Sequence, residues 1–159
     1  STLYLTLFPY TTLFRSHCAA SMIDRITDQA DIDDILRAPF SSVISDATYP
    51  AGGLLHPRVY GTFPRVLESY VRERHVLTLP EAVHKMTRLP ADRLGLARKG
   101  RIEVGADADL CLFDPAAIHE RGTWQDPEQL AAGMDYVFVA GVPAIAKGRF
   151  TGSRNGEVL

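Results

Sequence analysis

The stretch FSSVISD, Phe40 to Asp46, indicates the fold class of this chain. It is short and apolar, it contains the β-branched residues Val43 and Ile44, and a proline and a pair of glycines follow soon after it. A run of this kind, bounded by turn residues, predicts a buried strand followed by a loop. The stretch therefore favours an α/β fold in which other elements cover this strand.

Asp46 comes directly after the predicted strand. Burying a carboxylate lowers the stability of a protein, so a carboxylate in such a position often has a function. In barrels of alternating strands and helices, the C-terminal ends of the strands carry the catalytic groups. Asp46 is therefore a candidate catalytic residue, although the simpler interpretation is that it caps the following turn, and periodicity alone favours that simpler interpretation.

Helices are predicted on both sides of the strand. Asp28 or its neighbour Thr27 can cap a helix that runs to about Arg37, with Ile32, Ile35 and Leu36 on its apolar face, before a proline stops it. After a loop, the spacing of apolar residues predicts a second helix over residues 64–74. Two further helices are predicted, one beginning with a capping box formed by Thr78 and Glu81 and one following Pro90 and ending near Gly95.

The C-terminal part of the chain has the pattern of a small β unit. Extended structure is predicted at residues 102–104 and 108–114, and an irregular segment follows, in which the single Trp124 is expected to pack. Residues 136–140 and 143–147 then predict a hairpin. The order of elements is one helix, a strand, three helices and a small sheet.

Composition narrows the class of protein. The 159 residues are 46% hydrophobic and 23% charged, which suits one globular domain with a core, and the net charge is -2. This charge gives no positive field for a nucleic-acid or membrane partner, and no apolar run is long enough to cross a membrane. Cys18 and Cys111 lie far apart, which favours reduced thiols and a cytoplasmic protein.

The loop after Asp46 contains further candidate residues. Arg58 offers a rigid fork of donors that matches a carboxylate, so it could hold an acidic substrate, or it could pair with a neighbouring acid on the surface. His56 precedes it in the same loop and by itself is more typical of a structural residue than of a metal ligand. The remaining histidines form no HxH, HExxH or Cys/His cluster; they are His17, His75, His84 and His119.

Two segments resemble a known family. SDATYPAGGLLHPRVYGTFPRVLESYV, Ser45 to Val71, resembles the end of the catalytic barrel in the N-acyl-D-amino-acid deacylases (D-aminoacylases), where a Ser-Asp pair ends the last strand and an HPR-hydrophobe-[YW]-G-[TA]-F motif follows. LTLPEAVHKMTRLPADRLGLARKGRIEVGADADLCLFDP, Leu77 to Pro115, is similar to a pattern found more widely among metal-dependent amidohydrolases, in which the last helices lead into a small β domain. The likeness runs from about Ile23 to the end of the chain.

The resemblance implies roles for four residues. Asp46 matches the aspartate that acts as general base on metal-bound water and passes the proton to the leaving amine, and in some members it lies near the metal. Arg58 matches the arginine that binds the α-carboxylate of the substrate, while His56 and Tyr60 belong to the same motif in a supporting role. The implied substrate is a small molecule, an N-acyl-D-amino acid, and the implied cofactor is zinc. The sequence departs from the family in having Ala47 where glycine is more frequent, which affects the shape of the pocket.

The resemblance also implies that much of the enzyme lies elsewhere. A closed eight-stranded barrel needs roughly 200 to 250 residues, whereas this chain contains about one barrel strand, and the family's HxH pair and later histidines have no counterpart in it. We interpret the chain as a C-terminal fragment of a TIM-type barrel enzyme with part of a small β-sandwich domain, and expect it to be inactive by itself. The expected divisions are a non-native leader (1–16), the last strand and C-terminal helices (17–98) and the β-domain segment (99–159).

Three alternatives remain open at this point. The parent could be another amidohydrolase, such as a dihydroorotase-like cyclic amidase or an isoaspartyl-dipeptidase-like peptidase. The chain could instead be a non-catalytic association module in which Asp46 caps a turn. It could also fail to fold stably, because a single strand taken from a parallel sheet has unpaired edges on both sides.

Overall fold

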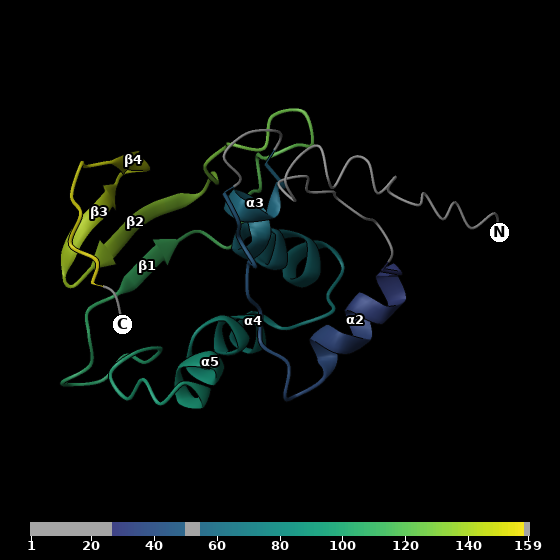
Figure 1. Ribbon diagram of the computed structural model, residues 1–159, viewed down its shortest axis with the longest axis horizontal. Coiled ribbons are helices and arrows are strands. Elements are labelled where there is room, and N and C mark those ends of the chain that lie inside the picture. The colour runs from purple at the N-terminus through teal and green to yellow at the C-terminus, as the bar shows by residue number, and fades with distance from the viewer. Residues whose placement is uncertain (1–26, 50–54, 158–159) are drawn as a thin grey trace, which may run out of the picture.

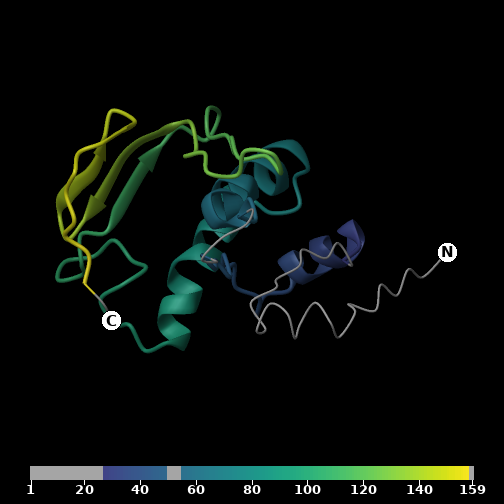
Figure 2. The ribbon, with the colours of Figure 1, turned by 45° about the horizontal axis from the view of Figure 1, so that its top comes forward.

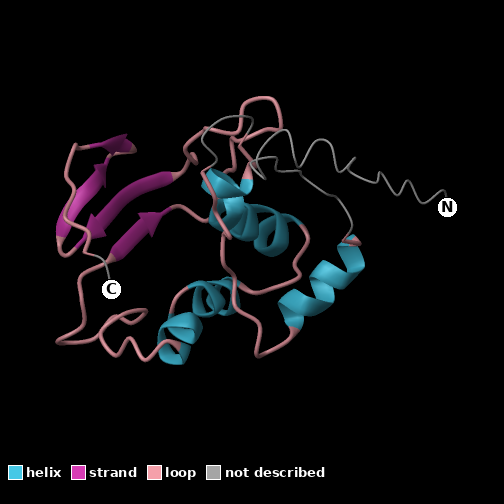
Figure 3. Cartoon of the chain, viewed as in Figure 1, coloured by secondary structure: helices cyan, strands magenta, loops and turns pink. Residues whose placement is uncertain are grey.

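The computed structural model describes residues 27–49 and 55–157 (Figure 1). The expected leader, residues 1–16, and part of the loop before His56 lie outside these ranges. Helices from the first half of the chain gather at one side and an antiparallel sheet from the second half lies at the other, so the content of helices and strands fits an α/β class (Figure 3). The elements are α2 (Gln29–Arg37), α3 (Arg58–Arg65), η1 (Val66–Glu73), α4 (Leu79–Met86), α5 (Arg88–Arg93), β1 (Leu110–Phe113), β2 (Met134–Val139), β3 (Val142–Ala146) and β4 (Arg149–Phe150).

Helix α2 forms where the sequence predicts it. The Asp28 side chain accepts a hydrogen bond from the Ala30 amide at 2.8 Å, which satisfies one of the free donors at the start of the helix. Ile32 and Leu36 pack against the core as expected. Ile35 does not, because its side chain is 59% exposed. Within the described ranges, no helix combines the length and apolar character needed to cross a bilayer.

The strand predicted at residues 40–45 is not formed. A turn at Phe40 is followed by residues without regular secondary structure, which pair with no strand in the described ranges, and Phe40 and Ile44 are 70% and 71% exposed. Only Val43 is buried in the core. An apolar run becomes a strand only where a neighbouring strand supplies a hydrogen-bond ladder, and a helix lies here instead: the Val43 amide donates to the carbonyl of Lys85 in α4 at 3.1 Å.

Lys85 is buried, which the apolar pattern of α4 did not predict. Its side chain is 5% exposed, and Nζ donates to the Ala38 carbonyl at 2.5 Å, to Ser41 Oγ at 3.0 Å and to the Ser41 carbonyl at 3.3 Å. Ala82 and Met86 face the core, whereas Val83 is exposed. A lysine is tolerated in a protein interior when its donors are paired, so Lys85 fixes the chain just before Asp46.

Helices α3 and η1 run on without a break from Arg58 to Glu73, which places the start of this helix six residues before the expected Pro64. Pro64 lies inside the helix, where it can donate no backbone hydrogen bond, and the backbone becomes π-helical from Val66 on. The core face is nevertheless the expected one, because Val66, Leu67 and Tyr70 are buried. As a result, the HPR segment leads directly into a helix instead of remaining in a loop.

The remaining helix signals are largely confirmed. Thr78 and Glu81 form the predicted capping box at the start of α4. Gly95 follows α5 with a φ of 71°, a left-handed conformation that glycine adopts without strain. Residues 102–104 form no strand and lead into a turn at Val104 and Gly105 instead of the expected extended piece, and Ile102 is 91% exposed. No described element covers that side chain, so its β-branched character is not enough to form a strand.

The four strands form one antiparallel sheet in the order β1-β2-β3-β4, with Leu110 opposite Phe138 and Val137 opposite Ile145. The predicted hairpin is confirmed, and its turn residues Ala140 and Gly141 both have positive φ, as the tightest hairpin turns require. A second turn of the same kind leads into the short β4, which the sequence pattern did not predict.

The segment between β1 and β2, residues 114–133, forms a connector that lies across α3 and η1 (Figure 2). Ile118 at its centre is fully buried and packs in the same core as Leu67 and Tyr70. The Ile118 carbonyl accepts a hydrogen bond from Arg72 Nη1 at 2.6 Å. The connector is irregular, as expected, but it holds the sheet against the helices.

Glu68 in η1 is the centre of the polar contacts between helix and connector. One carboxylate oxygen accepts from the Glu120 amide at 2.7 Å, and the other contacts His119 Nδ1 and, at 3.2 Å, Arg72 Nη2. Burial acts to raise the pKa of Glu68, but the hydrogen bonds from His119 and the Glu120 amide, with the charges of His119 and Arg72, outweigh it and lower the pKa.

Glu120 in the connector has the opposite electrostatic character. Burial raises the pKa of its carboxyl group and the charge of Glu68 raises it further, while the ion pair with Arg65, at 3.3 Å, acts to lower it. Its side chain occupies the place that a Cβ at Gly61 would fill, so a larger residue at this point of α3 would have to displace the Glu120 side chain. The helix and the connector therefore approach closely.

We expect Lys85→Met to lower the free energy of unfolding by about 1 to 3 kcal/mol, because the substitution removes the charged donor that joins α4 to the half-buried Ala38 and Ser41 carbonyls and to Ser41 Oγ. Urea unfolding followed by circular dichroism measures this difference. Lys99→Met, at an exposed ion pair, is the matched control and should cost less than about 1 kcal/mol. Equal stability of the Lys85 variant and the wild type would contradict a role for Lys85 in holding residues 38–43.

The two glutamates should respond to amide substitution with opposite signs. A carboxyl group with a lowered pKa contributes stability above its unfolded pKa, and this stability is lost as the pH falls through the folded pKa. Glu68→Gln should therefore lower the free energy of unfolding at pH 7 by about 1 to 3 kcal/mol, and by less below the ordinary glutamate value of 4.5. Urea unfolding at pH 7 and at about pH 4 measures the loss of unfolding free energy at each pH.

Glu120 has a raised pKa, so its ionised form opposes folding as the pH rises through the folded pKa. Glu120→Gln should therefore increase the free energy of unfolding at pH 7, and this gain should disappear at about pH 4. The same sign of change for both glutamine variants at pH 7 would show that these electrostatic assignments are wrong.

Candidate functional site

The structure brings the two main candidate residues together. Arg58 Nη2 lies 3.0 Å from Asp46 Oδ2, across a loop that begins directly after Asp46. The side chains are 39% and 70% exposed, so the pair faces solvent instead of being part of the core. The carboxylate of Asp46 and the guanidinium of Arg58 therefore lie next to each other at the surface, one before the loop and the other after it.

Asp46 itself has an unusual backbone. Its φ is 47°, in the left-handed region that aspartate and asparagine tolerate better than most other residues. It ends the segment that Lys85 holds, so its position follows from contacts made several residues earlier. The two interpretations of Asp46, as a turn residue and as a reactive carboxylate, are thus both compatible with its geometry, because a turn residue can also present its carboxylate to solvent.

Arg58 is the first residue of α3, where the helix leaves its first amides without partners. The Arg58 amide donates to His56 Nδ1 at 3.0 Å, so the imidazole takes the place of a capping side chain. In the guanidinium group, Nε is shielded from solvent and makes no hydrogen bond to any residue in the described ranges. This donor is closed to an incoming ligand, so a second carboxylate reaches the guanidinium by replacing Asp46 at Nη2.

His56 and Tyr60 flank Arg58 in different ways. The ring of His56 meets the ring of Trp124 edge-on, with centroids 4.9 Å apart and planes at 70°. Tyr60 lies on the first turn of α3 and is half-buried. The sequence predicted that Trp124 packs, but not that it packs here. The only signal for this contact was that a large aromatic side chain stands alone in an otherwise irregular segment.

The described residues do not form a metal site. Among them, no group of three or more histidine, cysteine, aspartate or glutamate side chains could hold a metal ion. His75 and His84 are exposed, and His119 contacts Glu68. The described partner of Asp46 is a cation, Arg58. The described part of the chain therefore supplies too few donors to complete a zinc site by itself.

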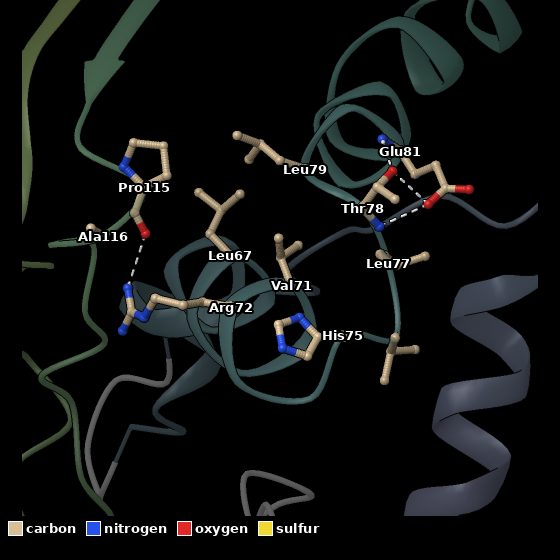
Figure 4. A pocket seen from close by; sticks show the side chains of 11 residues that line it. Leu67, Val71, Arg72, His75, Leu77, Thr78, Leu79, Glu81, Pro115 and Ala116 are labelled. Carbon is tan, nitrogen blue, oxygen red and sulfur yellow. Dashed lines mark hydrogen bonds between the residues drawn. The ribbon is translucent and has the colours of Figure 1, made fainter.

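A separate cavity of 570 Å³ lies between η1, the start of α4 and the connector (Figure 4). Its walls are mostly apolar and include Leu67 and Val71. Two of the polar side chains at its edge already have partners: Arg72 donates to the Pro115 carbonyl, and Glu81 belongs to the capping box. Neither Asp46 nor Arg58 lines this cavity, so it is not the site suggested by the sequence motif.

The arrangement of Asp46 and Arg58 limits the chemistry to which this part of the chain can contribute. The carboxylate can accept a proton, and the guanidinium can bind an anion through two parallel hydrogen bonds. Together they can hold an acidic small molecule next to a general base. The described residues do not supply the activated nucleophile that such a reaction also needs.

Comparison with known proteins identifies relatives. A family model described as "Amidohydrolase family" matches residues 25–145. D-aminoacylase of Alcaligenes xylosoxydans xylosoxydans is 41% identical over 140 residues, which are 88% of this chain and 29% of that protein. N-acyl-D-glutamate deacylase of the same organism is 42% identical over 130 residues, which are 82% of this chain and 26% of that protein.

A solved structure is similar in shape as well as in sequence. N-acyl-D-glutamate deacylase from Bordetella bronchiseptica, complexed with zinc and a phosphonate inhibitor that mimics the tetrahedral intermediate of the reaction, superimposes with a TM-score of 0.71 and 38% identity over 77% of this chain and 27% of that one. This chain therefore spans between a quarter and a third of the length of each of these relatives. The resemblance predicted from the two sequence segments is confirmed.

If Asp46 serves chemistry instead of stability, its removal should cost little folding free energy. Asp46→Asn keeps a side chain that tolerates positive φ, and the lost ion pair is exposed, so the free energy of unfolding should change by less than about 1 kcal/mol. Asp46→Ala should cost about 1 kcal/mol more, because alanine is strained in this conformation. Urea unfolding compares the two variants, and a loss above about 3 kcal/mol in Asp46→Asn would indicate a structural residue instead.

Proposed function

The chain belongs to the amidohydrolase family, and from this membership we propose that it forms part of an enzyme that hydrolyses the amide bond of N-acyl-D-amino acids. The observation that carries the proposal is the contact between Asp46 and Arg58, a proton acceptor beside an anion-binding fork, within the segment that resembles the deacylases. The names of the relatives support this substrate class over a cyclic amide or a dipeptide. The proposal extends beyond this chain, because the relatives are more than three times as long.

In the proposed reaction Arg58 binds the α-carboxylate of the substrate. Its Nη2 already holds a carboxylate, that of Asp46, so an incoming carboxylate can take the place of Asp46 at this nitrogen. Binding at this point fixes the amino-acid half of the substrate and leaves the acyl half to extend past it. A planar fork is better suited to this task than a lysine ammonium, which offers only a point charge.

Asp46 is the proposed general base. A substrate carboxylate that takes over Arg58 releases the Asp46 carboxylate from its ion pair, which makes it available to accept a proton. Asp46 then takes a proton from the attacking water and gives it to the nitrogen of the leaving amine, so that a carboxylic acid and a free D-amino acid are formed. His56 supports this arrangement by holding the start of α3, and Tyr60 lies on the same helical turn.

Zinc is the proposed cofactor, since the related deacylase from Bordetella bronchiseptica is complexed with it. When bound, zinc would supply an activated water. The described residues offer at most Asp46 as a ligand, so the remaining ligands would come from outside them. The steps assigned to this chain are therefore limited to proton transfer and carboxylate binding.

We also propose how the chain fits the enzyme. Residues 17–98 would supply the last strand and C-terminal helices of a TIM-type barrel, and residues 99–159 part of a small β-sandwich domain. The exposed side chains of Phe40 and Ile44 support this, because adjacent barrel strands and helices would cover them. The division falls between the helices and the sheet, near Gly100, where the secondary structure changes from one kind to the other.

The complete polypeptide that carries this chain is expected to release D-methionine from N-acetyl-D-methionine when zinc is present. Asp46→Asn should lower kcat by about 10²- to 10⁴-fold through loss of the base. Arg58→Lys should lower kcat/KM by about 10- to 100-fold through loss of the two-point hydrogen bond. Chiral chromatography of the released amino acid measures the rate of hydrolysis by the wild type and by the two variants.

Hydrolysis of dihydroorotate or of an isoaspartyl dipeptide without hydrolysis of any acylated D-amino acid would contradict the proposed function. The 159-residue chain itself, with zinc added, should release no D-methionine, because its described residues form no metal site. Release that disappears in Asp46→Asn would contradict this second expectation and show that the chain is catalytically complete.

A further inference from the structure

Trp124 is the residue of the connector that reaches the candidate site. It is separated from His56 by most of the helical part of the chain, yet their rings meet edge-on with centroids 4.9 Å apart. An aromatic edge placed against another ring is a favourable and directional contact. The contact therefore constrains the plane of the imidazole, and not only its position.

The connector is anchored independently of this contact. Ile118 is fully buried in the core, and its carbonyl accepts from Arg72 at 2.6 Å. The Glu120 amide donates to Glu68 at 2.7 Å, and the Glu120 side chain pairs with Arg65. Trp124 follows four residues later, so it extends toward His56 from a segment that η1 already holds. The connector therefore holds Trp124 in place, and Trp124 in turn restricts His56.

His56 passes this constraint to Arg58. Its Nδ1 accepts the hydrogen bond of the Arg58 amide at 3.0 Å, and this bond depends on the direction in which the imidazole plane points. The amide belongs to the first residue of α3, where no helical carbonyl can replace the lost acceptor. A rotation of the ring would therefore release the backbone from which the guanidinium extends toward Asp46.

We propose that Trp124 is a positioning residue for substrate binding, which acts through His56 to hold Arg58 where its guanidinium meets a carboxylate ligand. This inference rests on the proposed function, because Arg58 is taken to bind the α-carboxylate of an N-acyl-D-amino acid. In this scheme Trp124 acts through His56, against whose ring it packs. Two parallel hydrogen bonds to a carboxylate need a guanidinium held in place and in plane, so a small displacement of the backbone reduces binding.

The contact itself can be tested without any activity, because Trp124 is the only tryptophan in the sequence. In the full 159-residue chain, His56→Ala should shift the fluorescence emission of Trp124 to longer wavelength, since water replaces the imidazole beside the indole. His84→Ala removes an exposed histidine from α4 and is the matched control, which should leave the emission unchanged. If circular dichroism shows that His56→Ala is unfolded, His56→Gln replaces it. Unchanged emission in the folded His56 variant overturns the proposal.

The positioning role is tested by kinetics on the complete polypeptide, with N-acetyl-D-methionine as substrate. Trp124→Ala should lower kcat/KM by about 10- to 100-fold in the wild-type background, and by less than about threefold when Arg58→Lys is already present. Trp124→Phe keeps an aromatic edge and should restore most of the activity. Leu130→Ala, at an exposed position of the connector, is the control and should have no effect.

The outcomes separate this inference from the function on which it rests. An equal loss from Trp124→Ala in both backgrounds would mean that Trp124 stabilises the protein generally, and it would overturn the positioning role. Full activity of Trp124→Ala would overturn it as well. Absence of turnover in the wild-type complete polypeptide would instead overturn the proposed function, and the fluorescence result would still decide whether Trp124 holds His56.

Discussion

The buried ammonium group of Lys85 is the interaction on which the candidate site depends. It donates to Ala38 and Ser41, and the backbone of the same residue accepts from Val43, so one residue of α4 holds the segment before Asp46 through its side chain and its main chain. Without a neighbouring strand among the described residues, this segment has no other ladder to fix it. The direction in which the chain leaves toward Asp46 is therefore set by a lysine whose charge would be costly in the interior if its donors were not satisfied.

A segment from the second half of the chain also restricts the position of the site. The connector between β1 and β2 crosses α3 and η1 and is held there by Ile118 and by the contacts of Glu68. Glu68 and Glu120 lie close together in this contact, and their pKa values move in opposite directions because one carboxylate receives hydrogen bonds and the other is mainly desolvated. The helix that begins with Arg58 is thus packed against the core on one side and covered by the connector on another. Asp46 and Arg58 meet because these two constraints converge.

The described residues supply only part of a catalytic site, which is consistent with the similarity of this chain to a part of longer relatives. The amidohydrolase family model matches residues 25–145 of this chain. The named deacylases are similar to most of this chain and are much longer than it. The described residues contribute a carboxylate, a guanidinium and the packing that orients them, but no cluster that could bind a metal. A site whose parts come from distant segments requires each segment to be positioned by its own contacts, and Lys85 and the connector provide such contacts for the parts described.

The sequence by itself determined the features that depend on neighbouring residues: the cap of α2 at Asp28, the capping box of Thr78 and Glu81, the positive-φ glycine after α5 and the hairpin around Gly141. Each of these follows from hydrogen bonds or backbone conformations within a few residues, which a local pattern records. The family motif likewise identified Asp46 and Arg58 as candidates.

Only the tertiary structure decided whether the FSSVIS run forms a strand, where the helix after the HPR motif begins, and that Lys85 is buried while Val83 and Ile35 are not. It also decided that Trp124 lies against His56. These features depend on partners far away along the chain, and neither hydrophobic periodicity nor a motif states which distant residue will supply a hydrogen bond or an aromatic edge.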